Sequence, residues 1–113
     1  MPLTPGRYTA RALHGTLCET KTGKEQVAIA FEITTPDIEP ATITWFGIFG
    51  VSEKMTRRVL ESLRYCGWKG NDLSDLRGID ENEVELDIQN ETFNDKVYLR
   101  AKWVNRLGGG PMV

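Results

Sequence analysis

The chain has 113 residues, a formal net charge of −2 at pH 7 and 40% hydrophobic residues. A chain of this length buries roughly two-thirds of the surface exposed when it is unfolded, which suffices for one core and excludes two separate domains. Its two cysteines, Cys18 and Cys66, stand in no paired metal or redox spacing, which argues against a disulfide framework and a cysteine-based zinc site.

Neither the N-terminal segment nor any internal stretch predicts membrane contact. Residues 1–8 lack a basic and then apolar run, and the longest uncharged stretch, 40–52, is shorter than the about 20 residues that cross a bilayer. We therefore expect a soluble, cytoplasmic protein with no membrane partner.

Charge is distributed unevenly along the chain. Seven acidic residues and no basic residue lie between Arg77 and Lys96, so the rest of the chain carries 14 basic against 9 acidic residues. One folded domain can therefore present an acidic face and a basic face.

The first half of the chain predicts three strands. Apolar and polar residues alternate over 7–13 and again over 27–33, the period of a half-buried strand, and Gly23 between them suits a hairpin turn. After a polar loop with two prolines at 34–40, residues 43–49 are apolar on both faces. The sequence alone does not decide which face of this third strand is buried.

The hydrophobic period then changes to that of a helix. Met55, Val59 and Leu63 recur at helical spacing, Ser52 is a suitable N-cap, and Gly67 stands where a left-handed residue ends a helix, so we predict a helix over 53–66. Residues 71–76 predict one further helical turn.

Two more strands follow, over 83–88 and 97–104, joined by a tight turn at 93–96 where Asn94 and Asp95 tolerate turn geometry. We expect Val97, Leu99, Ala101 and Trp103 to face the core. Residues 1–105 form one domain in this prediction, and 106–113 form a flexible, glycine-rich tail.

The predicted order is three strands, a helix and two strands. This order predicts a mainly β protein with one helix, a five-stranded antiparallel Greek-key barrel of the OB-fold type, in which the helix connects strands three and four. A small antiparallel α+β sheet with the same element order is the alternative.

The sequence gives little support for catalysis. His14 is the single histidine and has no nucleophile or acid in a recognisable motif, and the acidic residues at 80–91 lack the spacing of a calcium-binding loop. We expect no enzymatic activity, no cofactor and no metal site.

Nucleic-acid binding has better support, because a groove for single-stranded nucleic acid combines cations for phosphates with aromatic rings for base stacking. Cations and rings recur on the outward faces of the predicted strands and in the two loops that flank the binding face of OB-folds. On the third strand, either Trp45 and Phe49 or Phe46 supplies the rings. The candidate binding residues are Arg7, Arg11, Lys21, Lys24, Trp45, Phe46, Phe93, Lys96, Tyr98, Arg100 and Lys102.

Six segments carry a resemblance to a known family: 5–8 (PGRY), 22–27 (TGKEQV), 43–46 (ITWF), 60–68 (LESLRYCGW), 72–76 (DLSDL) and 104–106 (VNR). Over nearly its whole length the chain resembles a family of small bacteriophage and prophage proteins described as single-stranded-DNA-binding proteins. Asp95 and Leu107 stand where relatives carry glycine and proline. The sequence ends in Gly-Pro-Met-Val, so we expect no partner recruitment through an acidic tail tip of the kind that bacterial single-stranded-DNA-binding proteins use.

The resemblance implies a non-enzymatic, sequence-tolerant single-stranded-DNA-binding protein of phage replication or recombination, acting in the host bacterial cytoplasm. Phage or host replication and recombination proteins, and further copies of the chain, remain open as partners. The alternative hypothesis is a protein-binding module, or an inhibitor of a host protein, that uses the acidic surface of the fourth strand.

Overall fold

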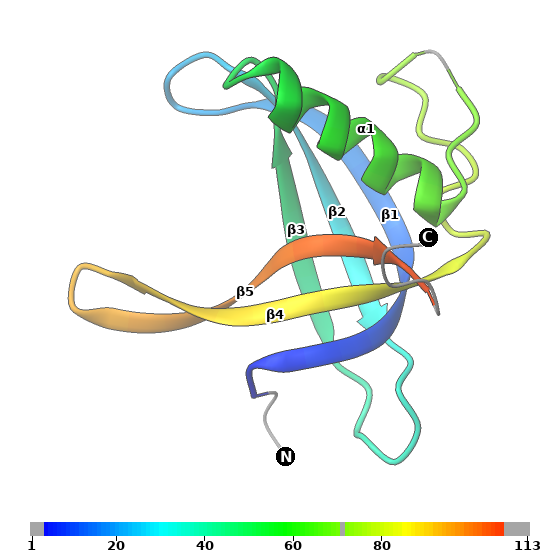
Figure 1. The fold of residues 1–113 in the computed structure, drawn as a ribbon, viewed down its shortest axis with the longest axis vertical. Coiled ribbons are helices and arrows are strands. Elements are labelled where there is room, and N and C mark those ends of the chain that lie inside the picture. The colour runs from blue at the N-terminus through cyan, green and yellow to red at the C-terminus, as the bar shows by residue number, and fades with distance from the viewer. Residues whose placement is uncertain (1–3, 71, 108–113) are drawn as a thin grey trace.

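A computed structural model describes residues 4–70 and 72–107, which form a mainly β structure with one α-helix among them (Figure 1). In chain order the elements are β1 (Gly6–Glu19), β2 (Glu25–Ile33), β3 (Thr42–Ile48), α1 (Glu53–Cys66), β4 (Glu83–Phe93) and β5 (Lys96–Arg106). The predicted order of strands and helix is confirmed. No helix in the described part of the chain is long and apolar enough to cross a membrane.

The five strands pair in a closed ring, in the order β1-β2-β3-β5-β4, with β4 pairing back to β1. Four of these pairs are antiparallel, but β3 and β5 are parallel and share the single register pair Trp45 and Ala101. The prediction of a wholly antiparallel sheet is wrong at this seam. Strand direction cannot alternate around a ring with an odd number of strands, so one neighbouring pair must be parallel.

β1 is longer than predicted and serves two neighbours. Its first half, from Gly6 to Arg11, pairs with β4, and its second half, from Ala10 to Glu19, pairs with β2. A bulge between Ala12 and His14 leaves Leu13 48% exposed, so the alternation of buried and exposed residues breaks there. The predicted strand ended at residue 13 because the sequence pattern ends at the bulge, although the strand continues.

α1 has the predicted bounds and lies across one end of the ring (Figure 1). The Ser52 hydroxyl accepts a hydrogen bond from the Met55 amide at 3.1 Å, which caps the first turn. Gly67, with φ of 124°, ends the helix, and a side chain there would collide with the carbonyl of Gly78. Val59 and Leu63 are buried against the interior of the ring, and Leu60 is half-buried.

The interior of the ring is filled by the apolar side chains that alternate along each strand. The largest fully buried side chains on strands are Phe31, Ile29, Leu86, Ile88, Val27, Val84 and Val104.

Two connections differ in how well they were predicted. The β4–β5 turn is confirmed, because Asn94 and Asp95 have φ of 50° and 62°, the pair of positive values that a two-residue hairpin turn needs. The predicted helical turn at 71–76 is not formed over 72–76, which consists of turns and irregular chain; residue 71 lies outside the described residues. β5 extends through Arg106, and residues 108–113 of the predicted tail lie outside the described residues.

Candidate nucleic-acid interface

The outward face of β2 and β3 is open beside one exposed aromatic ring. Register pairs Ala28 with Phe46 and Ala30 with Thr44, so two small side chains lie next to a phenylalanine that is 45% exposed. Trp45 points inward opposite Ile29 and is only 4% exposed. The open question about the third strand is therefore decided: Phe46 is on the surface, and Trp45 is mainly a core residue.

The β4–β5 hairpin projects beyond the ring as a two-stranded arm (Figure 1). Phe93 and Lys96 pair at its turn, and Glu91 pairs with Tyr98 two positions along each strand, so these four residues share one face. Phe93 is 61% and Tyr98 46% exposed. The arm thus brings together two rings and a cation that the sequence predicted for the site.

The opposite face of this arm does not face a core. Val97, which was expected to be buried, is 63% exposed. The prediction is wrong because this part of β5 lies beyond the ring, where no other element covers it. Leu99 is half-buried against the edge of the core.

Further along β5, a bulge changes which side chains point outward. Between the pairs Asp87 with Trp103 and Ile88 with Ala101, β5 contains the extra residue Lys102. Ala101 and Val104 are buried, whereas Trp103 points outward and is half-buried. The expectation that Trp103 faces the core is therefore wrong, because the bulge moves the inward position from Trp103 to Val104.

Arg100 and Lys102 share one carboxylate on β4. The Glu91 carboxylate lies 3.7 Å from Arg100 Nε and 3.3 Å from Lys102 Nζ. These side chains are 46% and 41% exposed, so both cations remain accessible to solvent. Phosphate oxygens can replace Glu91 at either cation.

The two predicted cations of β1 lie apart from this group. Arg7 lies 3.6 Å from Glu85 on β4, and Arg11 donates hydrogen bonds to the carbonyls of Asp80 and Glu81. Across the outward faces of β1, β4 and β5, Arg7 pairs with Asp87, and Asp87 pairs with Trp103. The acidic side chains of β4 therefore separate the β1 cations from the rings and cations of β5.

The loop between β1 and β2 lies at the end of β3, near the start of α1. Lys21 and Lys24 are exposed, and Lys24 Nζ donates to the Gly50 carbonyl at 3.3 Å. Among the described residues, no carboxylate forms an ion pair with either lysine. This loop adds positive charge beside β3.

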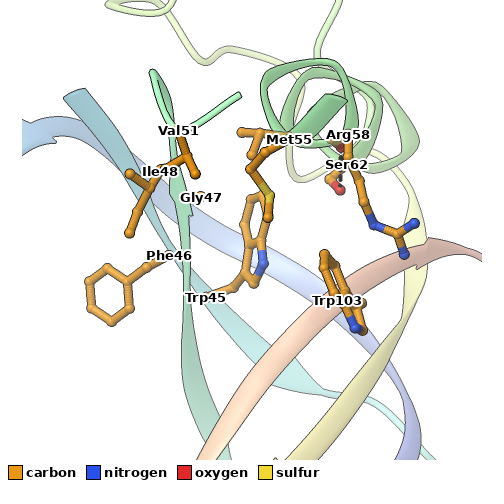
Figure 2. A pocket seen from close by; sticks show the side chains of 10 residues that line it. Trp45, Phe46, Gly47, Ile48, Val51, Met55, Arg58, Ser62 and Trp103 are labelled. Carbon is orange, nitrogen blue, oxygen red and sulfur yellow. Dashed lines mark hydrogen bonds between the residues drawn. The ribbon is translucent and has the colours of Figure 1, made fainter. Parts of the chain in front are cut away.

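A cleft that the sequence did not predict opens between β3, α1 and β5 (Figure 2). It has a volume of about 140 Å³ and is lined mainly by apolar side chains, among them Trp45, Met55 and Trp103. The Arg58 guanidinium lies 4.1 Å from the centre of a Trp103 ring. Sequence reasoning missed Trp103 and Arg58 because it placed the first in the core and treated the second as an ordinary solvated helix residue.

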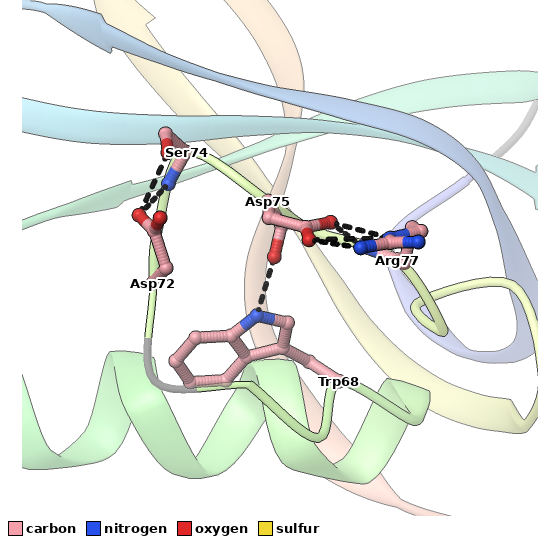
Figure 3. Close-up of polar contacts among 5 residues, drawn as sticks. All are labelled: Trp68, Asp72, Ser74, Asp75 and Arg77. Carbon is pink, nitrogen blue, oxygen red and sulfur yellow. Dashed lines mark hydrogen bonds and ion pairs between the residues drawn. The ribbon is translucent and has the colours of Figure 1, made fainter.

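The connection between α1 and β4 is held by polar contacts of its own (Figure 3). Trp68 Nε1 donates to the Asp75 carbonyl at 3.0 Å, and the Asp75 carboxylate accepts two hydrogen bonds from Arg77 Nε and one from Arg77 Nη2. Hydrogen bonds from Arg77 lower the pKa of Asp75, and hydrogen bonds from Ser74 lower the pKa of Asp72. These contacts shape the loop, and within it the carboxylates of Asp72 and Asp75 accept hydrogen bonds from neighbouring residues.

Within residues 4–70 and 72–107, no group of three or more His, Cys, Asp or Glu side chains is arranged to hold a metal ion. Burial raises the pKa of the Cys66 thiol to about 12, which keeps it protonated and unreactive near neutral pH.

No protein-family model matches the chain, and no curated protein matches it significantly. The resemblance to phage single-stranded-DNA-binding proteins therefore stays a prediction.

Proposed function

We propose that the chain is an OB-fold protein that binds single-stranded DNA without catalysing a reaction. The ring order β1-β2-β3-β5-β4, with α1 between β3 and β4 and lying across one end of the ring, supports an OB-fold barrel. In that fold, the outward face of the second and third strands and the loops after the first and fourth strands take the ligand.

One observation carries the functional proposal. Rings and cations lie on the outward faces of the neighbouring strands β2, β3 and β5 and at the tip of β4, beside two small side chains. We call these residues the ladder face: Ala28, Ala30, Phe46, Phe93, Lys96, Tyr98, Arg100 and Lys102. Phosphates pair with its cations and bases stack on its rings, while the two alanines leave room for the strand. Every base can stack on a ring, and the phosphates are the same whatever the base, so binding tolerates any sequence. The proposed setting is phage replication or recombination in the bacterial cytoplasm.

The test is a fluorescence-anisotropy titration with a labelled poly-dT oligonucleotide at two salt concentrations. Binding releases counterions from the phosphates, so affinity should fall steeply as salt rises. The double substitution Arg100→Ala with Lys102→Ala should lower the logarithmic salt slope by about 0.7 for each phosphate that the protein no longer neutralises.

Tyr98→Ala serves as the complementary variant. It should weaken binding by about 1–3 kcal/mol and leave the salt slope unchanged, because a stacked ring contributes contact area and no charge. If the parent protein binds no single-stranded DNA, the proposal is wrong. Wild-type affinity in both variants would move the site away from the ladder face.

A second candidate function rests on the acidic row of β4. Glu83, Glu85 and Asp87 alternate with buried residues and point outward. Such a row suits a basic protein partner, including one that otherwise binds DNA. Because Arg7 already pairs with Glu85, part of this charge is compensated within the chain, and we favour the DNA-binding proposal.

A further inference from the structure

The cleft between β3, α1 and β5 has the size of a single aromatic ring. An apolar cavity of about 150 Å³ holds a benzene-sized molecule. The cleft encloses about 140 Å³ and opens to solvent beside Val51, which is 58% exposed. A single nucleobase is of this order of size, so the cleft can take one base.

The walls of the cleft are suited to a flat, polarisable ring. The indoles of Trp45 and Trp103 both line it, and Figure 2 shows Phe46 directed away from them on the other side of β3. The Arg58 guanidinium lies against Trp103 and adds positive charge at the edge of the cleft. Aromatic rings and guanidinium planes are the groups on which proteins stack the bases of single strands.

Cations lie on both sides of the cleft opening. Lys102 immediately precedes Trp103 on β5, and on the other side Lys24 Nζ contacts the carbonyl of Gly50, the residue before Val51. A nucleotide whose base entered the cleft would therefore have cations near the phosphates before and after it. The cleft adjoins the ladder face, because Lys102 belongs to that face and Trp103, the next residue along β5, lines the cleft.

We infer that this cleft binds one base of the bound strand, stacked against the Trp103 indole. This inference rests on the proposed single-stranded-DNA binding and adds to it a subsite that takes up a single base.

Val51→Phe tests the subsite by closing its opening. Because Val51 is exposed, the substitution should leave the melting temperature unchanged, and Val51→Ala is the matched control that keeps the cleft open. Anisotropy titrations would use labelled dT and dA oligonucleotides of about 16 nucleotides. Val51→Phe should weaken the binding of both oligonucleotides by about 5- to 150-fold, the equivalent of removing one base stack. Val51→Ala should bind both oligonucleotides as the parent does.

Tryptophan fluorescence provides the second measurement. Trp45 and Trp103 line the cleft, whereas the third tryptophan, Trp68, is bonded to the α1–β4 connection. Addition of dT should quench emission in the parent and in Trp68→Phe, and the quenching should be largely abolished in Val51→Phe.

Arg58→Ala and Arg57→Ala remove the same charge from adjacent helix positions. Arg58 lies over Trp103, whereas Arg57 lines a different groove, beside Thr56 and Leu60. The Arg58 variant should lose more dT affinity than the Arg57 variant.

The outcomes separate this inference from the proposed function. A parent protein that binds neither oligonucleotide refutes both. A parent that binds dT, with Val51→Phe binding it equally well and quenching unchanged, refutes the cleft inference alone. Quenching that persists in Val51→Phe at reduced affinity would also overturn it, since the bases would then reach tryptophan by another route.

Discussion

Neutralising Glu91 should strengthen binding to single-stranded DNA. The Glu91 carboxylate lies 3.7 Å from Arg100 Nε and 3.3 Å from Lys102 Nζ, so it competes with phosphates for both cations. Each exposed ion pair contributes about 0.2–1 kcal/mol, and together the two oppose binding by roughly 0.4–2 kcal/mol. Glu91→Gln should therefore lower Kd by about 2- to 30-fold, nearer the lower figure because all three groups are partly exposed to solvent.

The assay is an anisotropy titration with a dT oligonucleotide at two salt concentrations, since screening should shrink the gain at high salt. Glu81→Gln is the matched control: it removes the same charge and one exposed ion pair, with Lys69, from the loop that follows α1. An equal gain in both variants would mean that only net charge matters. A loss of affinity in Glu91→Gln would mean that Glu91 positions Arg100 and Lys102 for the strand, and would refute the reasoning.

Two further predictions concern the folded state. The side chain of Leu63, on the inner face of α1, is fully buried, so Leu63→Ala should lower the free energy of unfolding by about 2–5 kcal/mol in chemical denaturation. A loss below about 0.5 kcal/mol would contradict this packing. Burial raises the pKa of Cys66 from 9.0 to about 12, so the protonated thiol favours the folded state below pH 9, and this contribution should disappear as pH rises from 9 to 12. In native protein at neutral pH, mass spectrometry should find Cys66 unmodified by iodoacetamide, and modified only after denaturation.

The features that were predicted correctly depend on neighbours in the sequence. Ser52 and Gly67 set the two ends of α1 through hydrogen bonds within a few residues of each helix end. Asn94 and Asp95 set the β4–β5 turn, because both adopt the positive φ that the turn requires. Such local chemistry can be read from a short segment, so these boundaries agree with the structure.

The features that were missed depend on strand register. In the segment Ala101 to Val104 the two apolar residues Trp103 and Val104 are adjacent, and alternation alone cannot decide which one faces inward. The bulge at Lys102 decides it, and that bulge exists only in the pairing with β4. Trp45 is a similar case: its inward orientation follows from its pairing with Ile29 on β2. Alternation along a single strand therefore could not decide which of these side chains face outward on the candidate surface.

The position of the cleft follows from the number of strands. A closed ring of five strands requires one parallel pair, and parallel neighbours cannot be joined by a tight turn, so α1 and β4 intervene between β3 and β5. These two strands share a single register pair, and beyond it the side chains of Met55, Arg58 and Trp103 line the space that pairing leaves open. The bulge at Lys102 turns Trp103 outward into this space. The least paired seam of the ring thus holds an indole with a guanidinium over it, one residue along β5 from Lys102 of the ladder face.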